Sequence, residues 1–130
     1  MDVDSKKKYW LDIAHYDLVS AKAMLEAKRF LHVGLLCHQT AEKCLKAYYW
    51  HNRKTEPPYT HNLLVLSEKS GFDVYSEDYI SFINELMPLN IQARYPEDKS
   101  LLLKSLNAKK CQDLYLKTKD FYLWIKKLLK

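Results

Sequence analysis

Three polar residues stand four positions apart in a largely apolar stretch of the chain: His38, Glu42 and Lys46. Residues at i, i+4 and i+8 of a helix lie above one another, so the spacing places an imidazole, a carboxylate and an ammonium on one stripe. Such groups could form a pocket for an anion or a nucleobase, with Lys46 balancing phosphate charge and Glu42 orienting the cations. A structural role fits equally, because Glu42 before Lys46 is the favoured order of a helical ion pair and His38 can bond a backbone carbonyl.

Two further candidates lie in connecting segments. Arg94 and Tyr95 precede a proline, which favours extended backbone before it and lets the guanidinium make a two-pronged contact with a carboxylate or phosphate. Arg94 could instead pair internally with an acid such as Glu42. His61, directly after the segment Pro57-Pro58-Tyr59-Thr60, is the third candidate.

Other chemistries lack the residues that they require. The two glycines, Gly34 and Gly71, cannot supply a Gly-rich phosphate loop. The cysteines at 37, 44 and 111 form no Cys-x-x-Cys pair, and His38 with Glu42 would give a metal at most two ligands. We therefore expect no metal, no cofactor and no catalytic residue.

Composition sets the broad class of protein. A chain of 130 residues is typical of one domain, here residues 1–130, with a core that needs no disulfide or metal. The start of the chain has no secretion signal, and no apolar run approaches the ~20 residues that cross a bilayer. We expect a cytoplasmic protein without membrane association.

Positive charge is concentrated near the end of the chain. Nine lysines and two aspartates from Lys99 onward give a balance of +7, whereas residues 1–98 carry twelve basic and fourteen acidic groups, a balance of −2. These lysines could solvate the outer face of a long helix, or could form a basic surface that binds RNA without catalysis.

Apolar residues recur at spacings of three and four, which predicts helices. We expect helices over residues 5–27, 30–52, 61–70, 76–88 and 104–130, and a loop over residues 89–99. Thr60 should cap the third helix, whose apolar face carries Leu63, Leu64 and Leu66. Leu128 should lie on the apolar stripe of the last helix. No segment alternates like a strand. The sequence predicts an all-α, up-and-down bundle of four to five helices.

Four motifs together resemble the HEPN domain, the higher-eukaryote and prokaryote nucleotide-binding family. They are Tyr9-Trp10 with Ala14 and Asp17-Leu18, the stretch His38-Gln39-Thr40-Ala41-Glu42-Lys43-Cys44-Leu45-Lys46-Ala47, Pro58-Tyr59-Thr60-His61-Asn62-Leu63, and Ala93-Arg94-Tyr95-Pro96. The resemblance implies a homodimeric helical bundle that binds a nucleotide and acts with a minimal nucleotidyltransferase, as a toxin–antitoxin-like pair. Nucleotide binding would then map onto His38, Glu42, Lys46, His61, Arg94 and Tyr95.

The resemblance also raises the possibility of ribonuclease activity, because the family's ribonucleases carry an Arg and a His separated by four to six residues. Here Arg29 and His32 have two residues between them, Arg53 and His61 have seven, and no His follows Arg94. The sequence thus favours a binding module without that motif. The alternatives are a diverged ribonuclease toxin that uses Arg53 with His51 or His61, and RNA binding through the basic last helix.

Overall fold

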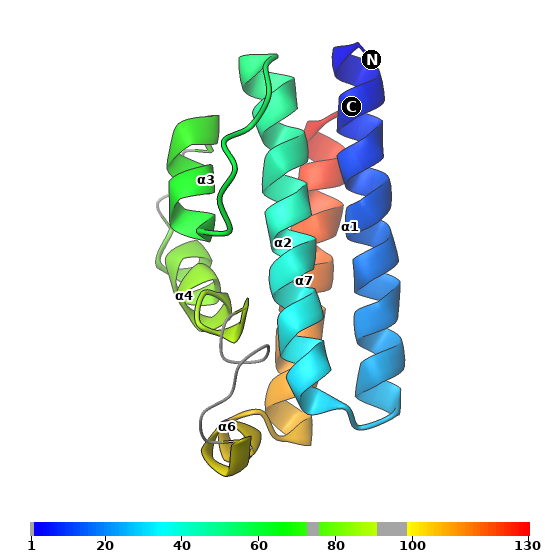
Figure 1. Ribbon diagram of the computed structural model, residues 1–130, viewed down its shortest axis with the longest axis vertical. Helices are drawn as coiled ribbons and strands as arrows, with labels where there is room; N and C mark the ends of the chain where they lie inside the picture. The colour runs from blue at the N-terminus through cyan, green and yellow to red at the C-terminus, as the bar shows by residue number, and fades with distance from the viewer. Residues whose placement is uncertain (1, 73–75, 91–98) are drawn as a thin grey trace.

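The computed structural model describes residues 2–72, 76–90 and 99–130. Within them the chain forms six helices and no strand: α1 (Val3–Glu26), α2 (Phe30–Arg53), α3 (Leu63–Ser70), α4 (Glu77–Leu86), α6 (Lys99–Ser105) and α7 (Ala108–Leu128) (Figure 1). The predicted all-α fold is confirmed. None of these helices combines the length and apolar character that crossing a membrane requires.

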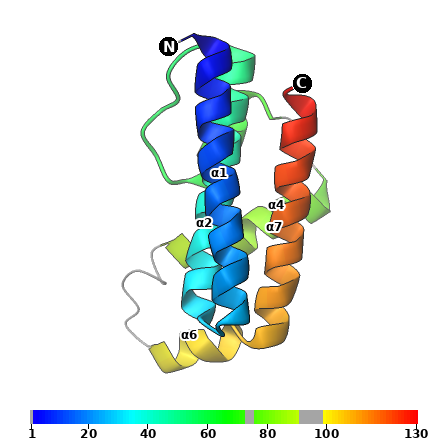
Figure 2. The same cartoon turned by 90° about the vertical axis from the view of Figure 1, so that its right-hand side faces the viewer.

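The helices form a bundle with four limbs. The long helices α1 and α2 run antiparallel, joined by a tight turn in which Lys28 has a positive φ of 62°. Three short helices, α3, α4 and α6, follow one another alongside α2 and together form what we call the third limb (Figure 1). The fourth limb is α7, which packs on α1 and α2. The two chain ends lie at the same end of the bundle, opposite α6 (Figure 2).

Small side chains let the long helices approach closely. Ala14 and Ala21 of α1 and Ala41 of α2 are fully buried, and so are the three cysteines, which are all free thiols. Burial raises the pKa of Cys37 to about 12, because a thiolate is poorly solvated in an apolar interior. The cysteines therefore act as small core residues, as their spacing predicts.

The start of α3 differs from the expected one. Asn62, not Thr60, is the N-cap: its side-chain oxygen accepts a hydrogen bond of 3.1 Å from the amide of Val65. The Thr60 hydroxyl accepts one from the Asn62 amide instead. Because the helix begins two residues later, His61 lies in the connecting segment and Leu64 turns outward.

The C-terminal third also departs from the prediction. Residues 99–105 form the separate helix α6, which ends before Asn107. The Asn107 side chain caps α7 by accepting a hydrogen bond of 2.9 Å from the Lys110 amide. The buried residue at the end of α7 is Leu129, whereas Leu128 is exposed. Leu89 and Asn90, expected in a loop, are helical and buried, and residues 91–98 lie outside the described residues.

Gly34 explains why Leu89 is buried. A Cβ at this position of α2 would lie 3.2 Å from Leu89 Cδ1 and 3.4 Å from Leu106 Cδ1. The glycine therefore lets two leucines from the third limb and from the α6–α7 junction rest on the backbone of α2. This contact was not foreseen from the sequence because it depends on which limbs meet.

Candidate functional site

Four of the six candidate residues meet at one point, around the carboxylate of Glu42. His61 Nδ1 donates a hydrogen bond to Glu42 Oε1 at 2.9 Å, and Lys46 Nζ donates to Oε2 at 3.2 Å. His38 Nδ1 lies 4.0 Å from Oε1, beyond hydrogen-bond distance. Arg94 and Tyr95 lie outside the described residues.

The chain brings His61 to Glu42 by turning back after α2. Lys54 ends α2 with a left-handed φ of 59°, and the buried Pro57 anchors the segment that follows. Asn62 then caps α3, so His61 lies immediately before the N-cap, beside the middle of α2. The histidine therefore reaches a carboxylate 19 positions earlier in the chain.

Three more residues complete what we call the Glu42 cluster. Lys43 Nζ lies 3.5 Å from Glu42 Oε2, and Lys46 Nζ lies 5.2 Å from the centre of the Trp10 ring, a cation–π distance. Asp17 of α1 is half-buried near Lys43, and its burial raises its pKa. Trp10 and Asp17 were not predicted as site residues, although both stand in the first of the four family-like motifs.

The cluster holds Glu42 ionised although it is buried. Burial by itself would raise the pKa of this carboxyl; Lys43, the hydrogen bond from His61 and Lys46 outweigh it, so the pKa is lowered. Burial has the opposite consequence for His38, whose pKa falls to about 4, so its ring is neutral at pH 7. Its Nδ1 atom is buried and has no hydrogen-bond partner among the described residues.

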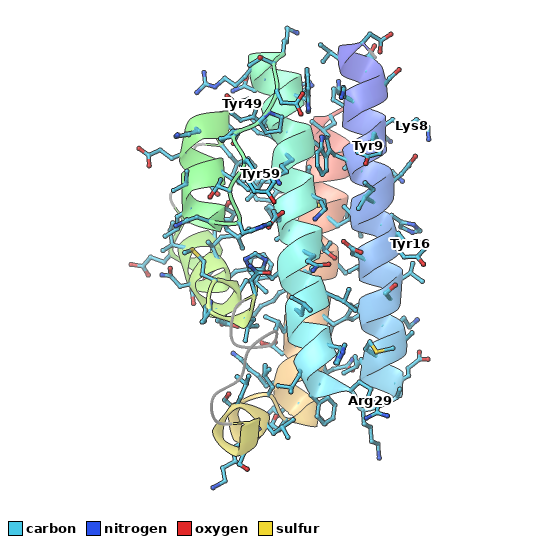
Figure 3. All side chains as sticks on the ribbon, in the orientation of Figure 1. Lys8, Tyr9, Tyr16, Arg29, Tyr49 and Tyr59 are labelled. Atoms are coloured by element: carbon cyan, nitrogen blue, oxygen red, sulfur yellow. The ribbon has the colours of Figure 1, made fainter. Side chains whose placement is uncertain are left out.

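The centre of the cluster is buried, and among the described residues its most exposed side chain is that of His61. His38, Glu42 and Lys46 are 1%, 2% and 7% exposed, so they support the site from within. The His61 side chain is 45% exposed, and its ring packs edge-to-face against Tyr59, which is 93% exposed, with 5.9 Å between ring centres. Tyr59 stands on the segment between α2 and α3 (Figure 3). A ligand approaching from solvent would thus meet a histidine held by a buried carboxylate, beside an exposed aromatic ring.

The residues of the ribonuclease alternative have a structural task. Arg53 Nε donates to the Lys69 carbonyl at 2.9 Å and Asn52 Nδ2 donates to the Ser70 carbonyl at 2.7 Å, which ties the end of α2 to the end of α3. His51 lies two positions before Arg53, so the two side chains point about 200° apart around the helix. Within one chain, His51 and Arg53 therefore lie on different sides of α2.

No group of three or more His, Cys, Asp or Glu side chains suited to a metal ion occurs in the described part of the chain. Of the C-terminal lysines, Lys110 and Lys117 bind Glu85 of α4 at 2.9 and 3.4 Å. These two ammonium groups therefore join α7 to α4.

The architecture and the cluster define a small helical module with a polar site on its second helix. A family model described as "HEPN domain" matches residues 7–128, nearly the whole chain. The chain belongs to the HEPN domain family. This membership suggests a helical module that binds a nucleotide or RNA. Neither the curated proteins nor the solved structures gave a match.

Proposed function

We propose that this chain is a nucleotide-binding HEPN module that lacks the ribonuclease motif, is homodimeric, and acts with a minimal nucleotidyltransferase in a toxin–antitoxin-like pair. The observation that supports nucleotide binding is the Glu42 cluster, in which one buried carboxylate gathers His61, Lys46 and Lys43 within 3.5 Å. Prearranged donors of this kind reduce the entropy lost when a ligand binds.

The exposed edge of the cluster would contact the ligand. Because His61 donates its Nδ1 proton to Glu42, the other ring nitrogen, Nε2, can accept a hydrogen bond from a ribose hydroxyl or from an N–H group of a base. The Tyr59 ring offers a face on which a base can stack. Arg94 and Tyr95 belong to the proposal as further phosphate and base contacts.

The buried members would act by positioning. Glu42 fixes the His61 ring, and Lys46 neutralises the carboxylate while its ammonium lies over the ring of Trp10. The buried Nδ1 atom of His38 has no hydrogen-bond partner among the described residues, and a ligand group or a water molecule could supply one. Substitution of these residues should weaken binding through the geometry of His61.

Thermal unfolding with and without a panel of ribonucleotides, each with and without Mg²⁺, tests nucleotide binding. A ligand at about 100 times its dissociation constant stabilises the fold by ~2.7 kcal/mol. We expect the stabilisation to disappear in His61→Ala and Arg94→Ala and to persist in His32→Ala, because His32 is an exposed histidine near the start of α2. No stabilisation by any nucleotide, or equal losses in all three variants, would contradict the proposed site.

Native mass spectrometry tests the partners. The purified chain should appear as a dimer, and co-expression with a nucleotidyltransferase encoded next to it should give a joint complex. A monomer would refute the homodimer, and two separate species would refute the partnership. Either result leaves the nucleotide measurement unaffected.

A further inference from the structure

A groove of about 620 Å³ is lined by residues of α4 and α7, and none of the residues of the Glu42 cluster lines it. Its described lining comes from both helices: Ser76, Asp78, Tyr79, Ser81, Phe82, Lys117, Asp120, Phe121 and Trp124. Tyr79, Phe82 and Phe121 are buried, and they supply aromatic surface beneath exposed polar residues. The groove is thus apolar at its base and charged at its rim.

Trp124 is the accessible aromatic residue of this groove, with 37% of its surface exposed. Its ring is held by edge-to-face contacts with Phe72 and Phe121, at 5.2 and 6.3 Å between ring centres. Such support keeps a large indole ring in place at the surface at little further cost in conformational entropy. The groove therefore presents a prearranged aromatic wall.

The rim carries negative charge on a chain with a net charge of +5. This groove and an adjoining hollow of about 590 Å³ along α4 are lined, among the described residues, by four carboxylates and one ammonium, from Glu77, Asp78, Glu85, Asp120 and Lys117. The ammonium of Lys117 is already bound by Glu85 at 3.4 Å and by Asp113 at 3.2 Å.

Two of those carboxylates are available to a ligand. Asp78 stands in the first turn of α4 and Asp120 in the middle of α7, so they reach the groove from different helices. Both are exposed, and neither has an ion-pair partner among the described residues. An aromatic wall and two exposed carboxylates in the lining of one groove are suited to a flat organic cation.

We infer that this groove is a docking site for an arginine-bearing basic segment of a partner protein. A guanidinium group stacks on an aromatic face and binds carboxylates in a two-pronged geometry, so one arginine side chain can use Trp124 together with Asp78 or Asp120. A lysine ammonium matches this combination less well because it is compact and strongly hydrated. The phosphates of a nucleic acid are repelled by the same carboxylates. The inference is independent of the nucleotide site proposed on α2.

Tryptophan fluorescence of the full chain, titrated with a short peptide of arginines spaced by glycine, tests the inference. The same peptide with citrulline in place of arginine is the matched ligand control, because citrulline keeps the shape and loses the charge. We expect a saturable change in emission with the arginine peptide, absent in Trp124→Phe, and no saturation with citrulline. Because the whole chain is positively charged, attraction of a cationic peptide reports a local acidic surface.

Substitutions locate the binding. In Asp78→Asn/Asp120→Asn the affinity measured by calorimetry should fall by about tenfold or more. The control Asp4→Asn/Glu26→Gln removes two charges from α1, on the other side of the bundle (Figure 1), and should leave the affinity within about twofold. Circular dichroism establishes that each variant is folded; if the double variant is not, Asp120→Asn alone and the citrulline comparison decide.

Three results would overturn the inference: no saturable binding by fluorescence and calorimetry, equal binding of the citrulline peptide, or equal losses in the α1 control. Direct binding of single-stranded RNA to the chain that is lost in Trp124→Phe and kept in the α1 control would also overturn it, because it would show that the groove accepts a polyanion.

Discussion

Replacing Glu42 by glutamine would remove the charge at the centre of the cluster and leave its shape. The change strands the ammonium of Lys46, which is 7% exposed and 3.2 Å from the carboxylate. Breaking a buried ion pair by removing one partner costs about 3 to 5 kcal/mol, because the remaining charge is uncompensated. A domain of this size has an unfolding free energy of about 6 to 20 kcal/mol. Glu42→Gln should therefore lose a large fraction of the stability and still fold.

Equilibrium unfolding in urea measures the loss, and a second substitution separates the charge effect from packing. Lys46→Met removes the ammonium and keeps an unbranched side chain against Trp10. With both charges gone, Glu42→Gln/Lys46→Met should be more stable than Glu42→Gln alone by about 1 to 3 kcal/mol. The matched control is Lys8→Met in the Glu42→Gln background, because Lys8 is an exposed lysine whose ion-pair partner is Asp12, a residue outside the cluster.

Two outcomes would refute this reasoning. If Glu42→Gln costs less than about 1 kcal/mol, the cluster is solvated and Lys46 is not stranded. If Lys46→Met gives no recovery in that background, the loss comes from the hydrogen bond of His61 and not from the buried ammonium. The second outcome would leave His61 as the principal partner of Glu42.

Three further predictions follow from the fold. The pKa of His38 is about 4 in the folded chain against an ordinary 6.5, so as the pH falls the unfolded chain takes up a proton on this histidine before the folded chain does. The free energy of unfolding should therefore keep its full value above pH 6.5 and fall by up to about 3 kcal/mol as the pH falls to 4. Urea titrations at several pH values measure this slope, and His38→Asn should flatten it. Gly71→Ala should cost about 1 to 2 kcal/mol or more in thermal unfolding, because Gly71 has a φ of 76° and a Cβ would lie 2.6 Å from Asn52 Nδ2; an unchanged midpoint would contradict the left-handed cap. The three buried thiols should react with a thiol reagent only when the chain unfolds, and fast labelling of the native protein would show that the core opens.

The long helices could be predicted because each buries one continuous stripe. In α1 and α2 the apolar spacing gave boundaries within two residues of those observed, and the short connection implied the antiparallel pair. The third limb was harder, since α3, α4 and α6 are short and owe their positions to tertiary contacts. Leu89 is buried because Gly34 on another limb makes room for it, and no local pattern contains that information.

For the candidate site, the stripe on α2 was predictable and its partners were not. Helical spacing alone places Glu42 beside Lys46, and the structure confirms that ion pair. The contact between Glu42 and His61 requires the chain to turn back over 19 positions, and the contribution of Asp17 requires α1 to pack on α2 in one register. The burial of His38 also follows from that packing, and of the four candidate residues that the structure describes, His61 is the one with an exposed side chain.

The C-terminal segment shows why the net charge of a sequence segment is a weak predictor of the charge on the folded surface. The segment from Lys99 onward carries +7, which favours attraction of a polyanion. Folding places α4 against α7, so that Glu85 binds Lys110 and Lys117 and Asp78 joins Asp120 at one groove. Among the described residues, the junction of α4 and α7 therefore carries more carboxylates than ammonium groups, because α4 adds Glu77, Asp78 and Glu85, and RNA bound to α7 would have to use its other lysines. A basic helix thus offers two surfaces of different charge, and a cationic partner and a polyanion need not compete for it.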